Sequence, residues 1–158
     1  LKSPEFHYCE SVTYGDWLIA GIDSCMKGDA AGRIEAREMD RLERLLDDTE
    51  AQHVLICLHH PPLPVGSKWL DEVGLRNGKE FLRLIAQTGK VRAAIFGHVH
   101  QAFEASHDSI QIIGTPSTCR QFKVASDEFA LDHNPPAYRR ISLHRDGCVE
   151  TELIWLTD

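Results

Sequence analysis

Two short apolar segments constrain the fold of this chain more than any other feature of its sequence. Val54–Leu58 has the sequence VLICL, and Val91–Phe96 has the sequence VRAAIF. Almost unbroken apolar runs of this length are typical of strands that are covered on both faces, as in a parallel sheet flanked by other layers. Between them, Leu75–Thr88 carries apolar residues at helical spacing. We therefore expect a parallel strand–helix–strand unit.

The flanking segments extend this unit into a mixed α/β fold. Asp16–Asp23 has the pattern of a strand that follows a hairpin turn at Gly15–Asp16, and Ala36–Asp48 has the pattern of an amphipathic helix. After Gln101, short runs alternate apolar and polar residues and are joined by turn sequences, which favours antiparallel hairpins. These runs are Ala102–Ser106, Ile110–Ile113, Tyr138–His144 and Val149–Leu156. The predicted fold class is α+β (mixed α/β), with mixed sheets flanked by helices in a single domain over residues 1–158.

Composition and charge limit the classes of partner. A chain of 158 residues, 42% hydrophobic and 26% charged, is long enough for one domain with a buried core. Its formal net charge of −7 argues against nucleic acid and anionic membranes as partners. No apolar run approaches the roughly 20 residues of a transmembrane helix. The cysteines include no C-x-x-C pair, which argues against a disulfide framework and a thiolate zinc site. We therefore expect a cytoplasmic protein.

Histidines follow both of the predicted buried strands. His59 and His60 come after the first strand, and His98 and His100 come after the second. The carboxyl ends of parallel neighbours meet at one rim, where ligands bind. Residues two apart in an extended segment project to one side, so His98 and His100 would face one site while Val99 turns into the core. Adjacent His59 and His60 would point in opposite directions, so only one of them would join.

Neutral imidazole is the commonest metal ligand, so this rim is a candidate metal site. A structural role through hydrogen bonds is the alternative for these four histidines. The remaining histidines are interpreted as surface or capping residues: His7, His53, His107, His133 and His144.

Several motifs in this order resemble a known family. LHHPPLPVGSKWLD (Leu58–Asp71) followed by FGHVHQ (Phe96–Gln101) resembles the C-terminal half of the calcineurin-like metallophosphoesterases. More narrowly, it is similar to the class III bacterial 3′,5′-cyclic nucleotide phosphodiesterases, as are GTPSTCRQFK (Gly114–Lys123) and LDEVGLRNGKEF (Leu70–Phe81). The resemblance implies that this chain is the C-terminal part of a four-layer α/β/β/α sandwich.

The resemblance also implies a metal centre. In that family two ions, commonly iron with manganese or a related divalent ion such as zinc, share a bridging aspartate and a bridging hydroxide. His59 and His98 would bind the second ion, and His100 would bind the first. His60 matches no ligand position, and we expect it to be hydrogen-bonded to backbone behind the ligands.

The chain departs from the family's pattern in its first half. It contains no D-x-H and no G-N-H motif, and Gly15–Asp16 and Gly28–Asp29 do not follow buried strands. We therefore expect the N-terminal motifs, with the general acid, to be missing and at most one ion to bind here. The complete protein would hydrolyse cyclic AMP to 5′-AMP, whereas this chain alone would be inactive or nearly so.

Further candidates lie outside the histidines. Trp69 would either stack on a purine or, as we favour, anchor the Pro61–Gly74 loop to the core. Arg120 and Lys123 would approach a phosphate if their segment lined the cleft, although solvated surface charges are the favoured interpretation. Asn77 is predicted to cap the following helix.

Two other functions remain open from the sequence. The first is a mononuclear zinc hydrolase that is complete in itself, with His59, His98 and His100 as ligands. The second is a non-catalytic dimerising fragment. Loss of half of the sheet would expose an apolar edge, so we expect this chain to form a homodimer.

Overall fold

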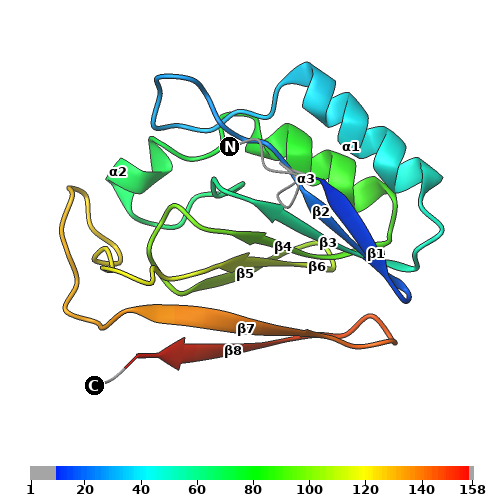
Figure 1. The fold of residues 1–158 in the computed structure, drawn as a ribbon. Coiled ribbons are helices and arrows are strands. Elements are labelled where there is room, and N and C mark those ends of the chain that lie inside the picture. The colour runs from blue at the N-terminus through cyan, green and yellow to red at the C-terminus, as the bar shows by residue number, and fades with distance from the viewer. Residues whose placement is uncertain (1–9, 157–158) are drawn as a thin grey trace, which may run out of the picture.

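The fold places one helical layer and one small sheet on opposite faces of a larger sheet. The computed structural model describes residues 10–156 of the chain. In Figure 1 the helices α1 and α3 lie above the larger sheet, and the β7–β8 hairpin lies below it. The elements are β1 (Ser11–Tyr14), β2 (Trp17–Gly21), α1 (Ala36–Asp48), β3 (His53–Leu58), α2 (Lys68–Asp71), α3 (Gly78–Gln87), β4 (Val91–Phe96), β5 (Phe103–His107), β6 (Ile110–Gly114), β7 (Ala137–Leu143) and β8 (Val149–Trp155).

The larger sheet has six strands in the order β1-β2-β3-β4-β6-β5. Its inner strands β2, β3, β4 and β6 are parallel, whereas the edge strands β1 and β5 are antiparallel to their neighbours. Leu58 at the end of β3 pairs with Phe96 at the end of β4, and α3 lies between these strands in the chain. The predicted strand–helix–strand unit is therefore confirmed, and both strands end at the same rim.

Each face of the sheet has its own core, which explains the unbroken apolar sequence of β3. Val54 and Ile56 belong to the core that includes Leu42 of α1 and Phe81 of α3. Leu55 points to the other face and belongs to the core that includes Val149 of β8. Complete burial of one such side chain contributes about 1.5–3 kcal/mol. A central strand with both faces covered therefore has little room for polar residues.

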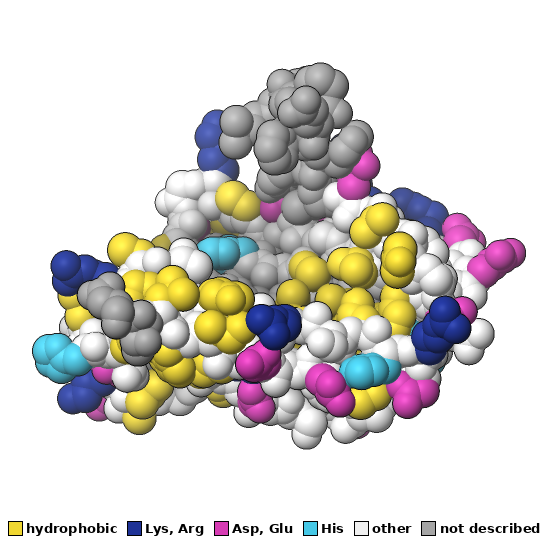
Figure 2. All heavy atoms as spheres, turned by 60° about the horizontal axis from the view of Figure 1, so that its bottom comes forward, with side chains coloured by type: hydrophobic (Ala, Val, Ile, Leu, Met, Phe, Trp, Pro, Cys, Tyr) yellow, Lys and Arg dark blue, Asp and Glu magenta, His cyan; other side chains and the backbone are white. Residues whose placement is uncertain are grey.

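The β7–β8 hairpin covers only part of the lower face. Ile19, Cys57 and Ile95 pack against the second core but remain partly exposed. On the side turned forward in Figure 2, hydrophobic side chains gather in two groups with charged residues between them. An apolar sheet face that is left partly open in this way is a surface on which a further layer can pack.

The turn of the hairpin is held at the amino-terminal end of the larger sheet by His53. Its Nε2 atom lies 3.1 Å from the carbonyl oxygen of Arg145, and its Nδ1 accepts a hydrogen bond of 3.2 Å from Arg92. Nearby, Trp17 Nε1 donates to the His144 carbonyl at 2.8 Å. His53 is buried, so its interpretation as a surface or capping residue is wrong. The hairpin that buries it comes from a distant part of the chain.

Asn77 does not cap α3, contrary to the prediction. It stands at the N-cap position, but its side chain makes no capping hydrogen bond. Its Oδ1 accepts from the Ile34 backbone N–H at 3.0 Å, and its Nδ2 donates to the Ile34 carbonyl at 2.9 Å. Asn77 therefore fixes the loop before α1 rather than its own helix, and α3 begins only at Gly78.

The remaining local predictions agree with the structure within a few residues. Gly15 and Asp16 form the turn between β1 and β2, and the loop at 61–74 contains the short helix α2. The cysteines Cys25, Cys57, Cys119 and Cys148 are free, whereas Cys9 and His7 lie outside the described residues. Among the helices that are described, none is long and apolar enough to span a bilayer.

Candidate metal centre

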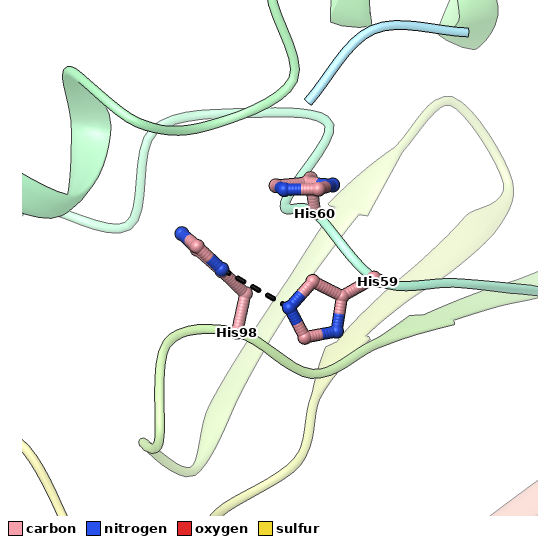
Figure 3. Close-up of side chains that lie close together, drawn as sticks. All are labelled: His59, His60 and His98. Carbon is pink, nitrogen blue, oxygen red and sulfur yellow. Dashed lines mark hydrogen bonds between the residues drawn. The ribbon is translucent and has the colours of Figure 1, made fainter. Parts of the chain in front are cut away.

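Three imidazoles meet where β3 and β4 end. His59 and His60 directly follow β3, and His98 follows β4 after one residue (Figure 3). His59 Nε2 and His98 Nδ1 are 3.2 Å apart. The His60 ring lies 4.9 Å from the His59 ring and 4.7 Å from the His98 ring, between centroids. One nitrogen from each of the three lies within 4.8 Å of the others.

The backbone at this rim is turned rather than extended. His98 and His100 have φ angles of 64° and 48°, in the left-handed region that non-glycine residues seldom adopt. The premise that these two residues project to one side of an extended segment is therefore wrong. Val99 between them is fully buried, as predicted. Strained backbone of this kind persists where surrounding packing holds it, and it is frequent at functional sites.

The prediction that His59 and His60 point in opposite directions is also wrong. Regular strand geometry ends at Leu58, and the next two residues form a bend. Because side chains alternate only in regular strand geometry, both rings can turn toward His98 (Figure 3). His59 remains exposed, whereas His60 is buried behind it.

His60 is hydrogen-bonded through both ring nitrogens, and one of these bonds goes to backbone, as predicted. Its Nδ1 lies 2.8 Å from the Ser24 hydroxyl, and its Nε2 lies 3.3 Å from the Ala30 carbonyl oxygen. Ser24 and Ala30 come from the loop that follows β2. No local pattern in the sequence indicates these two residues, although the end of a third parallel strand at the same rim could have suggested that loop.

The electrostatic environment keeps the imidazoles neutral. Burial, followed by the neighbouring imidazoles, lowers the pKa of His98 to about 4. Partial desolvation also lowers the pKa of His59, and burial lowers the pKa of His60. His98 Nε2 is buried and has no hydrogen-bond partner within residues 10–156. Neutral rings with an unpartnered buried nitrogen are suited to bind a cation.

His100 lies beside this group but outside its closest set. Its ring is stacked on Phe122 at 4.2 Å between centroids, and its Nδ1 lies 2.9 Å from the Arg120 carbonyl oxygen. A carbonyl oxygen only accepts hydrogen bonds, so Nδ1 carries the proton and Nε2 keeps its lone pair. A histidine held in this way presents Nε2 as a ligand atom.

The other candidates, Trp69, Arg120 and Lys123, lie in different surroundings. Trp69 packs against Phe122 and Phe129, at 5.1 and 5.3 Å between centroids, and so anchors its loop. Arg120 and Lys123 have exposed side chains. Contact of any of these three side chains with a substrate stays a prediction.

A cleft of about 710 Å³ opens beside the histidines. Its walls come from the loop after β2 and from the ends of β3 and β4. Asp23 and Met26 line it together with His59 and His98. The volume is within the usual range for a small-molecule site, and none of these loop residues was predicted from the sequence.

No protein-family model matches the chain. Comparison with curated proteins finds 36% identity over 147 residues, which is 93% of this chain, to the 3′,5′-cyclic adenosine monophosphate phosphodiesterase CpdA of Pseudomonas aeruginosa. The CpdA of Escherichia coli K12 is 38% identical over 142 residues, or 90% of this chain. Over about nine tenths of its length, this chain is similar in sequence to the CpdA phosphodiesterases. It covers 54% and 52% of those two CpdA proteins, so it spans about half the length of the curated relatives it matches.

A solved structure supports the same fold. A dimetal phosphatase from Danio rerio superposes with a TM-score of 0.51 at 23% identity, covering 80% of this chain and 40% of that one. The mixed α/β fold predicted from the sequence is therefore confirmed as a metallophosphoesterase fold. With the CpdA relatives, this also confirms the resemblance inferred from the HHPP and GHVH motifs.

Proposed function

We propose that this chain is the histidine-bearing part of a metal-dependent phosphodiesterase that hydrolyses 3′,5′-cyclic AMP to 5′-AMP. The observation that carries the proposal is the pair His59 and His98, with nitrogens 3.2 Å apart at the shared rim of β3 and β4. Homology to CpdA over about nine tenths of the chain supports the substrate class. The partly open lower face of the sheet supports a larger sandwich, with residues 1–158 as one domain that supplies part of it.

The residues present fit a divalent ion. The proposed ligands are His59, His98 and His100. The lowered pKa of His59 favours its neutral form, and His98 has an unpartnered buried Nε2. His100 is bonded through Nδ1, which leaves its Nε2 for an ion. A divalent ion held there would lower the pKa of bound water and polarise a phosphoryl oxygen. Imidazole ligands suit zinc and iron, and the resemblance favours iron with manganese in the complete two-ion enzyme. The close group holds no carboxylate within the described residues, so the chain alone suits one ion.

The chain's own side chains prepare this site before any ligand arrives. The bond from His100 to the Arg120 carbonyl fixes its tautomer, and the stacked Phe122 ring fixes its plane. Burial around His98 keeps bulk water from its Nε2. The adjacent cleft is large enough for a mononucleotide.

Binding of Zn²⁺ or Mn²⁺ and hydrolysis of cyclic AMP test this function. His59→Ala and His98→Ala should each weaken Zn²⁺ binding at least roughly tenfold, the lower end of the loss seen even for residues that only orient ligands. His133→Ala removes an exposed histidine elsewhere and is the matched control. Equal binding by all three variants would contradict the proposal.

A mononuclear zinc hydrolase is the second candidate, because the clustered groups are imidazoles alone. It requires one bound ion and phosphodiester hydrolysis by the chain as it stands. One bound ion without hydrolysis would favour the proposed two-ion enzyme, and no bound ion would favour the non-catalytic fragment.

We further propose a homodimer in the cytoplasm. The edge strand β1 is exposed, with Val12 at 58% and Tyr14 at 84% exposure, and an exposed edge favours pairing with a second copy. Exposed free thiols at Cys25, Cys119 and Cys148 suit a reducing compartment. Light scattering tests the dimer, and a monomer at micromolar concentration would contradict it.

A further inference from the structure

We propose that His60 is a positioning residue that holds the His59 and His98 rings in place and does not itself bind the metal. The inference rests on the metal centre proposed above. His60 lies as close to the centre as a ligand would. One of its ring nitrogens is within 4.8 Å of a nitrogen of His59 and of a nitrogen of His98. Proximity alone would therefore make His60 a third ligand.

The hydrogen bonds of His60 exclude that role. The Ala30 carbonyl only accepts, so the proton shared with it belongs to His60 Nε2. Nδ1 then carries the only in-plane lone pair of the ring. This nitrogen accepts a hydrogen bond from the Ser24 hydroxyl at 2.8 Å. The Ser24 oxygen in turn accepts from the His60 backbone N–H at 3.4 Å. Every polar atom of the ring is satisfied, and no lone pair is left for an ion.

Packing fixes the His60 ring from behind. A Cβ atom at Gly32 would overlap the ring, so only glycine leaves the space that the imidazole fills. The Gly32 backbone is itself held, because its N–H donates to the Gly74 carbonyl at 3.1 Å and its carbonyl accepts from the Arg76 N–H at 2.8 Å. His60 thus rests against a wall of fixed backbone.

The front of the ring contacts the two proposed ligands. It meets the His59 ring nearly at right angles, with an interplanar angle of 89°, and the His98 ring at 45°. Figure 3 shows His60 above the pair, with its ring turned toward the space between them. Displacing His60 would therefore release both ligand rings. Binding of a metal ion by His60 itself would instead require its buried hydrogen bonds to break.

Nitrogen-15 NMR of the imidazoles tests the assignment directly. His60 should be the Nε2–H tautomer in the metal-free chain and should remain so after Zn²⁺ is added, while His59 and His98 shift. A His60 Nδ1–H tautomer, or a His60 nitrogen that becomes metal-bound, would overturn the proposal. Absence of any Zn²⁺ binding would instead refute the metal centre, and the metal-free tautomer would still decide the state of His60.

Variants separate positioning from general stability. Gly32→Ala, which pushes on the ring, should lower Zn²⁺ affinity about tenfold and shift the ring resonances of His59 and His98 in the metal-free chain. His60→Ala should behave similarly, and His60→Gln, which keeps a donor for the Ala30 carbonyl, should restore most of the affinity. His53→Gln is the matched control, because His53 is also buried with both nitrogens bonded but lies at the other end of β3. It should leave the affinity unchanged, and a loss equal to that of Gly32→Ala would overturn the proposal.

Discussion

The Nε2 atom of His59 lies 3.2 Å from the Nδ1 atom of His98, although 39 residues separate them in the chain. One of the two nitrogens must carry the shared proton, because two bare lone pairs would repel each other at this distance. The contact depends on β3 and β4 being parallel neighbours that end together. It gives the clearest link from the strand pattern in the sequence to chemistry at the rim.

Acid should destabilise the metal-free chain through His98. Its pKa is lowered from 6.5 to about 4 by burial and then by the neighbouring imidazoles, so the folded state binds fewer protons than the unfolded state. This contribution is complete above pH 6.5 and is lost as the pH falls from 6.5 toward 4. Urea unfolding across this range should show a smaller decline for His98→Asn than for the parent chain. Parallel declines would contradict the assignment.

His53 should contribute strongly to stability by joining the hairpin to the larger sheet. His53→Ala removes a buried ring and leaves the Arg145 carbonyl and the Arg92 guanidinium without this partner. We expect the free energy of unfolding to fall by about 2–4 kcal/mol. Urea denaturation measures it, with His133→Ala as an exposed control that should change stability by less than about 0.5 kcal/mol. A similar small effect for both would show that the hairpin is held elsewhere.

Cys57 should react more slowly than the other free thiols of the described chain. Burial raises its pKa to about 11, so little thiolate is present at pH 8. Alkylation of the native chain, mapped by mass spectrometry, should label Cys25, Cys119 and Cys148 at least about tenfold faster. Rates that become equal in urea would identify folding as the source of protection. Fast labelling of native Cys57 would contradict the raised pKa of this partly buried thiol.

Asn77 offers a test between a cap and a bridge. Asp is as good a helix N-cap as Asn, so Asn77→Asp would be neutral if the residue capped α3. In the structure the amide also donates to the Ile34 carbonyl at 2.9 Å, and a carboxylate cannot replace this bond. We therefore expect Asn77→Asp to lower the free energy of unfolding by about 1–2 kcal/mol. Thermal and urea unfolding provide the measurement, and an unchanged midpoint would restore the cap interpretation.

The sequence predicted those features that depend on neighbours within the same element. The apolar runs of β3 and β4 and the stripe of α1 reflect burial of their own faces, and all three elements form where expected. His53 and Asn77 were misjudged because their partners, Arg145 and Ile34, lie in a turn and a loop that are distant in the chain.

The position of the candidate site could be predicted from the sequence, but the orientation of its side chains could not. The rule for the ends of parallel strands brought His59 and His98 to one rim, and the structure places them in contact. It could not give the orientation of the rings, because the positive φ of His98 and the bend after β3 leave regular strand geometry. Ser24 and Gly32 were missed for a different reason. They matter because their loop packs against His60, and the local sequence does not indicate this contact.

The position of β3 has a consequence for the motions of the site. This strand is hydrogen-bonded to β2 on one side and β4 on the other, and it feeds residues into both cores. Its amide hydrogens can therefore exchange with deuterium only when the sheet itself separates, whereas the exposed strand β1 can fray alone. The imidazole at residue 59 therefore directly follows a strand that opens only together with its neighbours, and it is separated from the edge of the sheet where fraying begins.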